Sequence, residues 1–164
     1  LSGESAMGAY PVDSAAMLAR IAGAIEPYRR TVSARELFEG IDLKGKVPPA
    51  KLIDLSVETV LQYVDPAAVF VPTHSGDTAR SIARFRLPAW IVAVSSQETA
   101  CQRLQFSSGV HPVCEVEHPE DWKSYVSNWL KASGIQGKLA VVTEGPSSRY
   151  PDANYRLEIV DLAV

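Results

Sequence analysis

The side chains best suited to chemistry in this sequence lie in one short segment, THSGDT at positions 73–78. The segment joins a run of β-branched residues to a helical pattern. The amino terminus of a helix offers backbone N–H groups and a favourable dipole to an anion. Hydroxyls and a glycine also let a ligand approach the backbone closely, as in other phosphate-binding loops. The candidate anion ligands are Thr73, Ser75, Gly76, Asp77 and Thr78.

The same segment also has a purely structural interpretation. Ser75 can cap the following helix with Asp77 in its first turn, and the local sequence alone favours this interpretation. Asp77 argues further against a phosphate, because a carboxylate repels one at close range. His74 is the one histidine in the segment, and a surface position is the commoner outcome for such a residue.

A second candidate for phosphate contact is the turn at positions 144–154. Arg149 and the serines beside it can reach a phosphate, although a solvated hairpin is the commoner state of such residues. The segment EVEH at 115–118 alternates polar side chains and is more often solvated than metal-binding. The sequence contains no Walker loop, nucleophile elbow or HExxH motif, so we assign it no catalytic residue and no metal ligand.

Two cysteines, Cys101 and Cys114, lie thirteen positions apart without a CxxC motif. We expect both to be buried, reduced thiols of a cytosolic protein rather than parts of a disulfide framework or a zinc site.

Short β-branched runs alternate with helical stretches from Ala68 onward, which is typical of a parallel α/β sheet. The runs cover residues 68–72, 90–94, 110–116, 138–143 and 155–160. Three of them are almost continuously apolar, as expected for strands covered on both faces. No helix separates the last two, so the last strand must pair antiparallel or lie at an edge. The pattern predicts an α/β three-layer sandwich with a mostly parallel five-stranded sheet, an antiparallel last strand and helices on both faces.

Apolar spacing predicts the helices that position these strands. They cover residues 11–26, 49–64, 77–85, 97–104 and 119–132. The first of these helices has a broad apolar face, and the polar stretch before it has no hydrophobic core of its own. Residues 29–48 contain glycines and charges and are predicted to form a linker with a short helix at 34–39.

Composition restricts the partners of the chain. Its formal charge is −3 without a dense block of lysine and arginine, which gives no electrostatic support to a nucleic-acid or anionic-membrane partner. No apolar run approaches the roughly 18 residues of a membrane span, and no segment has the pattern of a signal peptide. The chain opens at Leu1 rather than a methionine, which suggests a piece of a longer protein.

Several segments together resemble pyruvate kinases. Residues 1–11, LSGESAMGAYP, are similar to the LSGETA-x-G-x-YP segment that closes the catalytic barrel of that family, and residues 12–26 resemble its last barrel helix. Residues 71–86, VPTHSGDTARSIARFR, are similar to T-x-S-G-x-(S/T)-A-x-x-(I/V)-A-x-x-R. Residues 88–94 match P-x-x-(I/V)-(I/V)-A-V, and residues 99–113 contain the T-A pair and G-V-x-P-V.

The resemblance implies a domain organisation and a parent activity. Residues 1–28 would be the end of the catalytic barrel, 29–48 a linker, and 49–164 the C-terminal regulatory α/β domain. The parent enzyme would transfer a phosphoryl group from phosphoenolpyruvate to ADP in the cytoplasm with magnesium and potassium, and would form homo-oligomers partly through this domain. The catalytic residues of the family lie in the preceding barrel, so none is assigned here.

The resemblance also implies that the loop at 73–78 holds a phosphate of a small-molecule effector, which makes that interpretation about as strong as helix capping. The family's glycine-rich turn before its last strand is matched only at Gly145 and Asn154, which argues against fructose bisphosphate; the alternatives are a different phosphorylated effector or none. The alternative is a stand-alone, non-enzymatic binding or assembly module with this fold.

Overall fold

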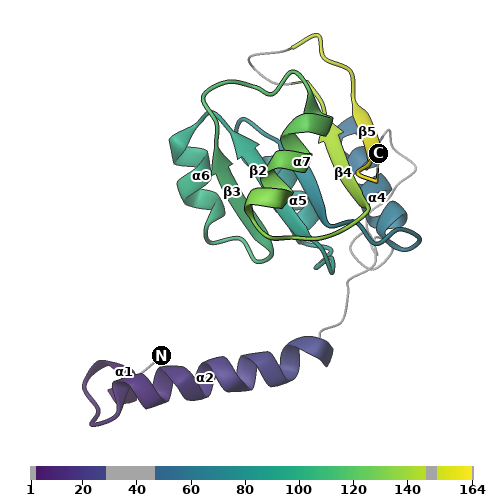
Figure 1. Ribbon diagram of the computed structural model, residues 1–164. Helices are drawn as coiled ribbons and strands as arrows, with labels where there is room; N and C mark the ends of the chain where they lie inside the picture. Colours follow the sequence, from purple (N-terminus) through teal and green to yellow (C-terminus); the bar gives the residue numbers. More distant parts are fainter. Residues whose placement is uncertain (1–2, 29–46, 147–150, 164) are drawn as a thin grey trace. The chain divides into compact units, whose positions relative to one another are not determined.

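The computed structural model describes residues 3–28, 47–146 and 151–163 of the 164-residue chain (Figure 1). The chain divides into two compact units, Leu1–Arg30 and Thr31–Val164. Most of the predicted linker, including the short helix at 34–39, lies outside the described residues.

The first unit is built around one helix. It comprises α1 (Gly3–Ala6), α2 (Pro11–Ile25) and the 3₁₀ turn η1 (Glu26–Tyr28). Proline suits the first turn of α2 because the N–H that it lacks would have no partner inside the helix. None of the α2 side chains is buried. No helix in the described part of the chain is long and apolar enough to cross a lipid bilayer.

The second unit contains a five-stranded sheet in the order β3-β2-β1-β4-β5. The strands are β1 (Ala68–Pro72), β2 (Trp90–Ser95), β3 (Val110–Cys114), β4 (Leu139–Glu144) and β5 (Arg156–Asp161). Every pairing is parallel except that of β4 with β5, which is antiparallel. The predicted sheet is confirmed, including its antiparallel last strand.

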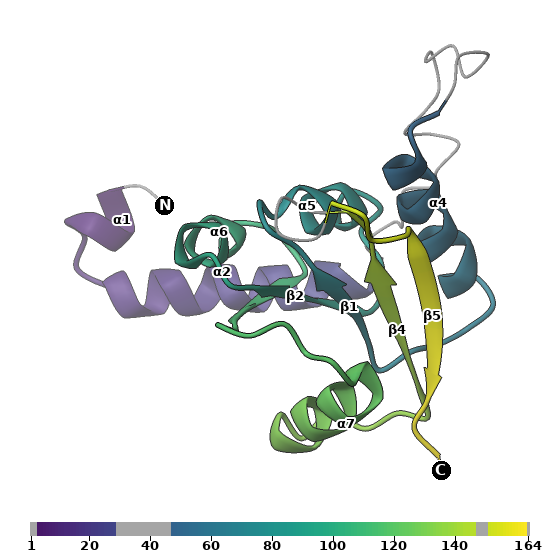
Figure 2. The same ribbon diagram turned by 90° about the horizontal axis from the view of Figure 1, so that it is seen from above.

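Helices cover both faces of the sheet, as the α/β pattern predicts. Helices α4 (Pro49–Leu61), α5 (Asp77–Ala83) and α6 (Glu98–Leu104) lie on one face, and α7 (Trp122–Ala132) lies on the other (Figure 2). Alternate residues of β1 supply the two cores, because successive side chains of a strand point to opposite faces. Val69 and Val71 pack with α4 and α5, whereas Phe70 packs with α7.

Several helix and strand boundaries differ from the predicted ones. Helix α7 begins at Trp122 rather than at residue 119, because the Asp121 carboxylate caps it and accepts hydrogen bonds from the backbone N–H groups of Lys123 and Ser124. Strand β3 ends at Cys114 instead of residue 116, where its pairing with Ser95 of β2 ends.

The prediction that both cysteines are buried is wrong for Cys114. Cys101 is buried, whereas Cys114 is exposed. Cys114 is the last residue of a strand at the edge of the sheet. A second neighbouring strand is therefore absent on that side, and less of the chain covers its side chain.

Strand order creates a crevice at one end of the sheet. Strand β1 lies between β2 and β4, so the chain continues from β1 to one side and later returns on the other. At such a topological switch point the connections that follow the two strands diverge, and a ligand can enter between them at the carboxyl ends. The loop at 73–78 follows β1 directly at this position.

Candidate functional site

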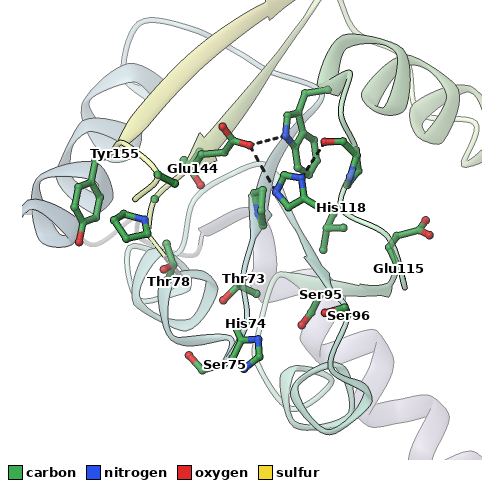
Figure 3. Close-up of a pocket in the computed structure, with 18 of the residues that line it drawn as sticks. Thr73, His74, Ser75, Thr78, Ser95, Ser96, Glu115, His118, Glu144 and Tyr155 are labelled. Carbon is green, nitrogen blue, oxygen red and sulfur yellow. Dashed lines mark hydrogen bonds and ion pairs between the residues drawn. The ribbon is translucent and has the colours of Figure 1, made fainter. Parts of the chain in front are cut away.

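A cavity of about 680 Å³ lies at the carboxyl ends of β1, β2 and β4. Its volume is within the usual range for a small-molecule site. The β1–α5 loop and the two serines at the end of β2 form one side. Glu144 and His118 lie on the side opposite His74 and Ser75, with Tyr155 at one end and Glu115 at the other (Figure 3).

The structure brings only part of the predicted anion site to the cavity. Thr73, Ser75 and Thr78 line it, together with His74. Gly76 and Asp77 are not among the described lining residues. Arg149 lies outside the described residues.

The β1–α5 loop is held by its own hydroxyl groups. The backbone N–H of Gly76 donates to Thr73 Oγ1 at 2.9 Å, and that of Asp77 donates to Ser75 Oγ at 3.3 Å. These two N–H groups already donate to side-chain oxygens of the loop. A phosphate could accept from them only by displacing those oxygens. The loop offers inward-facing donors, but a ligand must compete for them.

The prediction that Ser75 is the residue capping α5 needs correction. Gly76 occupies the N-cap position with φ of +84° and no side chain to accept a bond. Ser75 lies one residue earlier, and its hydroxyl accepts from Asp77 N–H as part of the turn. A left-handed backbone is required here, and glycine adopts it without the strain that a Cβ would impose.

The carboxylate of Asp77 is occupied by neighbouring groups. Ser75 Oγ donates to Asp77 Oδ2 at 2.7 Å, and Arg80 forms an ion pair with Oδ1. The Ser75 hydrogen bond, followed by the Arg80 guanidinium, lowers the pKa of Asp77 below its ordinary value. Arg80 thus offsets part of the repulsion that Asp77 would exert on an anion in the cavity.

Across the cavity, Glu144 is a fixed carboxylate. Its Oε1 accepts from Trp122 Nε1 at 2.8 Å, and its Oε2 lies 2.6 Å from the Arg156 guanidinium. The side chain is 22% exposed, so its charge is partly removed from water. Because both oxygens have partners and Arg156 balances the charge, Glu144 is better suited to accept a hydrogen bond from a ligand than to remove a proton.

His118 links this carboxylate to the segment before α7. Its Nδ1 lies 2.9 Å from the carbonyl oxygen of Pro119, and its Nε2 lies 3.7 Å from Glu144 Oε1. A carbonyl oxygen only accepts, so Nδ1 carries the proton in this contact.

Glu115 is a second carboxylate of the cavity that is held by a hydrogen bond. Its Oε1 accepts from the Tyr125 hydroxyl at 3.1 Å. Burial, and then this hydrogen bond, raises the pKa of Tyr125 well above its ordinary value, so the phenol remains protonated as a donor. Helix α7 therefore holds two carboxylates of the cavity through aromatic side chains, Glu144 through Trp122 and Glu115 through Tyr125.

The described lining of the cavity is acidic and hydroxyl-rich. Four glutamates contribute to it, at positions 115, 117, 120 and 144, whereas none of the described lining residues is a lysine or arginine. In the part of the chain that the structure describes, no group of three His, Cys, Asp or Glu side chains could hold a metal ion. This lining favours a ligand with many hydrogen-bonding groups over one with two phosphates.

Sequence reasoning missed part of the site. It did not predict that Ser95 and Ser96 at the end of β2, Tyr155 before β5, and Glu144 at the end of β4 line the cavity. The signal available was positional. Ser95, Ser96 and Glu144 end or follow parallel strands at the same end of the sheet as the β1–α5 loop. Tyr155 precedes the antiparallel strand β5, which begins at that same end.

Replacing Trp122 by phenylalanine tests the Glu144 contact. The change removes the indole donor and leaves a partly buried carboxylate oxygen with weaker partners, so we expect a loss of about 2 kcal/mol in the free energy of unfolding. Urea denaturation followed by circular dichroism measures it. Trp129→Phe on the same helix is the matched control, and an equal loss in both variants would contradict a specific role for the Trp122–Glu144 hydrogen bond.

Comparison with known proteins identifies the family. Residues 52–155 match the model of the pyruvate kinase alpha/beta domain. The chain is 41% identical over 119 residues to a pyruvate kinase of Thermococcus litoralis, covering 72% of this chain and 25% of that protein. It is 31% identical over 152 residues to a pyruvate kinase of Clostridium acetobutylicum, covering 88% of this chain and 31% of that protein.

A solved structure has the same fold. The crystal structure of a pyruvate kinase from Cryptosporidium parvum aligns with a TM-score of 0.76 and 23% identity, covering 99% of this chain and 32% of that one. The chain thus spans about a quarter to a third of the length of these proteins. The α/β architecture, the matched domain and the shared sequence together establish that this chain belongs to the pyruvate kinase family and contains its C-terminal α/β domain.

Proposed function

We propose that this chain is the regulatory and subunit-assembly part of a pyruvate kinase, and that its cavity binds a phosphorylated small-molecule effector. The parent enzyme would convert phosphoenolpyruvate and ADP to pyruvate and ATP in the cytoplasm as a homo-oligomer. Its magnesium and potassium would be bound in the preceding catalytic barrel, since phosphoryl transfer needs metal ions and cationic clamps around the phosphates.

The observation that carries this proposal is the position of the β1–α5 loop. Thr73, Ser75 and Thr78 face a cavity of about 680 Å³ at the topological switch point of a pyruvate kinase α/β domain. A phosphate at the loop would exchange internal hydroxyl contacts for charge-assisted hydrogen bonds, which are roughly twice as strong as neutral ones. The carboxylates opposite would accept hydrogen bonds from the hydroxyl groups of the same ligand. One phosphate with a polyhydroxylated body therefore suits the lining better than two phosphates.

Regulation would work through differential binding. An effector that binds more tightly in one arrangement of the subunits favours that arrangement, and only this difference in affinity can shift the equilibrium. The cavity lies at the ends of β1, β2 and β4, so its tightening around an effector would be transmitted through the sheet and α7.

Titration of the purified chain with sugar monophosphates and inorganic phosphate tests the effector site. We expect heat release in calorimetry and a raised melting temperature with at least one of these ligands. Thr78→Val should weaken binding about tenfold, the equivalent of roughly 1.4 kcal/mol, by removing one hydrogen bond to the phosphate. Thr59→Val is the matched control, because Thr59 is exposed on α4 and its hydroxyl donates to the Leu55 carbonyl within the helix.

Unchanged melting across the whole panel would contradict the effector proposal and favour a loop that only begins α5. Equal weakening by both threonine variants would also count against a phosphate at the β1–α5 loop. The alternative of a stand-alone module is decided separately, by whether the reading frame before Leu1 encodes barrel strands and metal ligands.

A further inference from the structure

The two cysteines lie near one another beside the cavity, although they belong to different elements. Cys101 lies on α6, and its sulfur is 3.8 Å from the carbonyl oxygen of Ser95 and 3.6 Å from that of Val113. These carbonyls belong to neighbouring strands, and the β2–β3 register pairs Ser95 with Cys114. Cys101 therefore lies over the junction of the strands at the position where Cys114 ends β3.

The two thiols differ in accessibility. Cys101 is 7% exposed, whereas Cys114 is exposed to solvent. Burial raises the pKa of Cys101 to about 11, with a further contribution from the neighbouring Cys114. The buried thiol of Cys101 thus contacts the carbonyl of Val113, the residue that precedes the accessible Cys114, which places the two cysteines as an attacking and a resolving pair.

We propose that Cys114 and Cys101 form a reversible dithiol–disulfide pair that is oxidised by low-molecular-weight disulfides. The Cys114 thiolate attacks one sulfur of the reagent, forming a mixed disulfide and releasing one small thiolate. The Cys101 thiolate then attacks the Cys114 sulfur, forming the internal disulfide and releasing the second small thiolate. The chain loses two electrons and two protons, and the reagent is reduced to two thiols.

The disulfide would act on the wall of the cavity. Ser95 and Ser96 precede α6, and Glu115 follows Cys114, and all three line the cavity. Drawing the two sulfurs to bonding distance pulls α6 toward the end of β3 and moves these groups. The expected effect on ligands rests on the proposed effector site, whereas formation of the disulfide does not.

The second step sets a distinctive pH dependence. Burial, the largest cause of the raised pKa of Cys101, persists in the mixed disulfide, so little of this thiol is ionised at pH 7. The pKa is raised, so the reactive thiolate appears as the pH increases toward it. Closure of the mixed disulfide should therefore accelerate about tenfold for each pH unit between 7 and 10.

The experiment treats the full 164-residue chain with oxidised glutathione under native conditions and follows the intact mass. We expect a product lighter by about two hydrogens, a Cys101–Cys114 link in the peptide map, and recovery of both thiols with a reductant. Cys101→Ser should stop at the mixed glutathione disulfide on Cys114, and Cys114→Ser should resist the reagent. The oxidised chain should bind inorganic phosphate at least threefold more weakly or more tightly than the reduced chain.

Three results would overturn the disulfide proposal: unreacted native thiols, a link that forms only in urea, or disulfide-bonded dimers as the main product. Cys114→Ser that reacts as fast as the unaltered chain would also contradict it. If the internal disulfide forms but the chain binds no phosphate in either redox state, the disulfide proposal is supported. Only the effector proposal is then contradicted.

Discussion

Phe70→Ala should lower the free energy of unfolding by about 3–5 kcal/mol, the usual cost of removing a buried aromatic ring together with the cavity that remains. Phe70 lies in the central strand β1 and is fully buried. Its ring meets Trp129 edge to face with centroids 5.5 Å apart and Tyr125 with centroids 6.4 Å apart. The variant loses these contacts, and the regular elements on both sides of the gap cannot collapse into it.

Phe106→Ala is the matched control, because the same atoms are removed from a side chain that is 93% exposed. We expect this second change to stay within about 0.5 kcal/mol of the unaltered chain. Urea titrations followed by circular dichroism measure both variants. Similar losses in the two variants would contradict the assignment of Phe70 to the core between the sheet and α7.

The second large effect is expected for Gly76→Ala, at the N-cap of α5. A Cβ at this position has two costs. The backbone has φ of +84°, which L-residues adopt only with strain, and the added carbon would lie 3.0 Å from the side chain of Leu104. Leu104 is fully buried, so its side chain would have to shift within a packed core to make room. Strain and overpacking together predict a loss of about 2–4 kcal/mol in the free energy of unfolding.

Gly134→Ala separates the two costs. Gly134 also has a positive φ, of +67°, but a Cβ there meets no atom within 4 Å. This control should lose only the backbone part, about 1 kcal/mol. Thermal and urea denaturation of both variants test the difference. If Gly76→Ala is no more damaging than Gly134→Ala, the close approach of the β1–α5 loop to α6 does not contribute to stability.

Residue patterns along the chain were sufficient for much of the fold. Apolar β-branched runs separated by helical stretches are specific to a parallel α/β sheet, and the missing helix between the last two runs predicted the antiparallel pairing of β4 and β5. These properties are local, because the period of two or 3.6 residues depends on how side chains project from one strand or one helix. The boundary of α7 was less predictable, since Pro119 and Asp121 both resemble the first residues of a helix and only the capping contacts distinguish them.

The candidate site was also predictable only in part. The loop at 73–78 was recognisable because its hydroxyls and glycine are adjacent in sequence, and its position after β1 followed from the pattern. Its partners across the cavity were not recognisable. Glu144 and His118 lie far from it in sequence. Glu144 reaches the cavity because β4 pairs with β1, and His118 reaches it on the segment between β3 and α7.

The sequence by itself therefore determined the class of fold, the pyruvate kinase kinship and the segment best suited to bind an anion. Tertiary structure decided which carboxylates face that segment, and that Cys114 is exposed while Cys101 is buried. The physical reason is that hydrophobic periodicity encodes which face of an element is buried. Strand order and edge position, which bring distant side chains together, arise from the packing of all the elements at once.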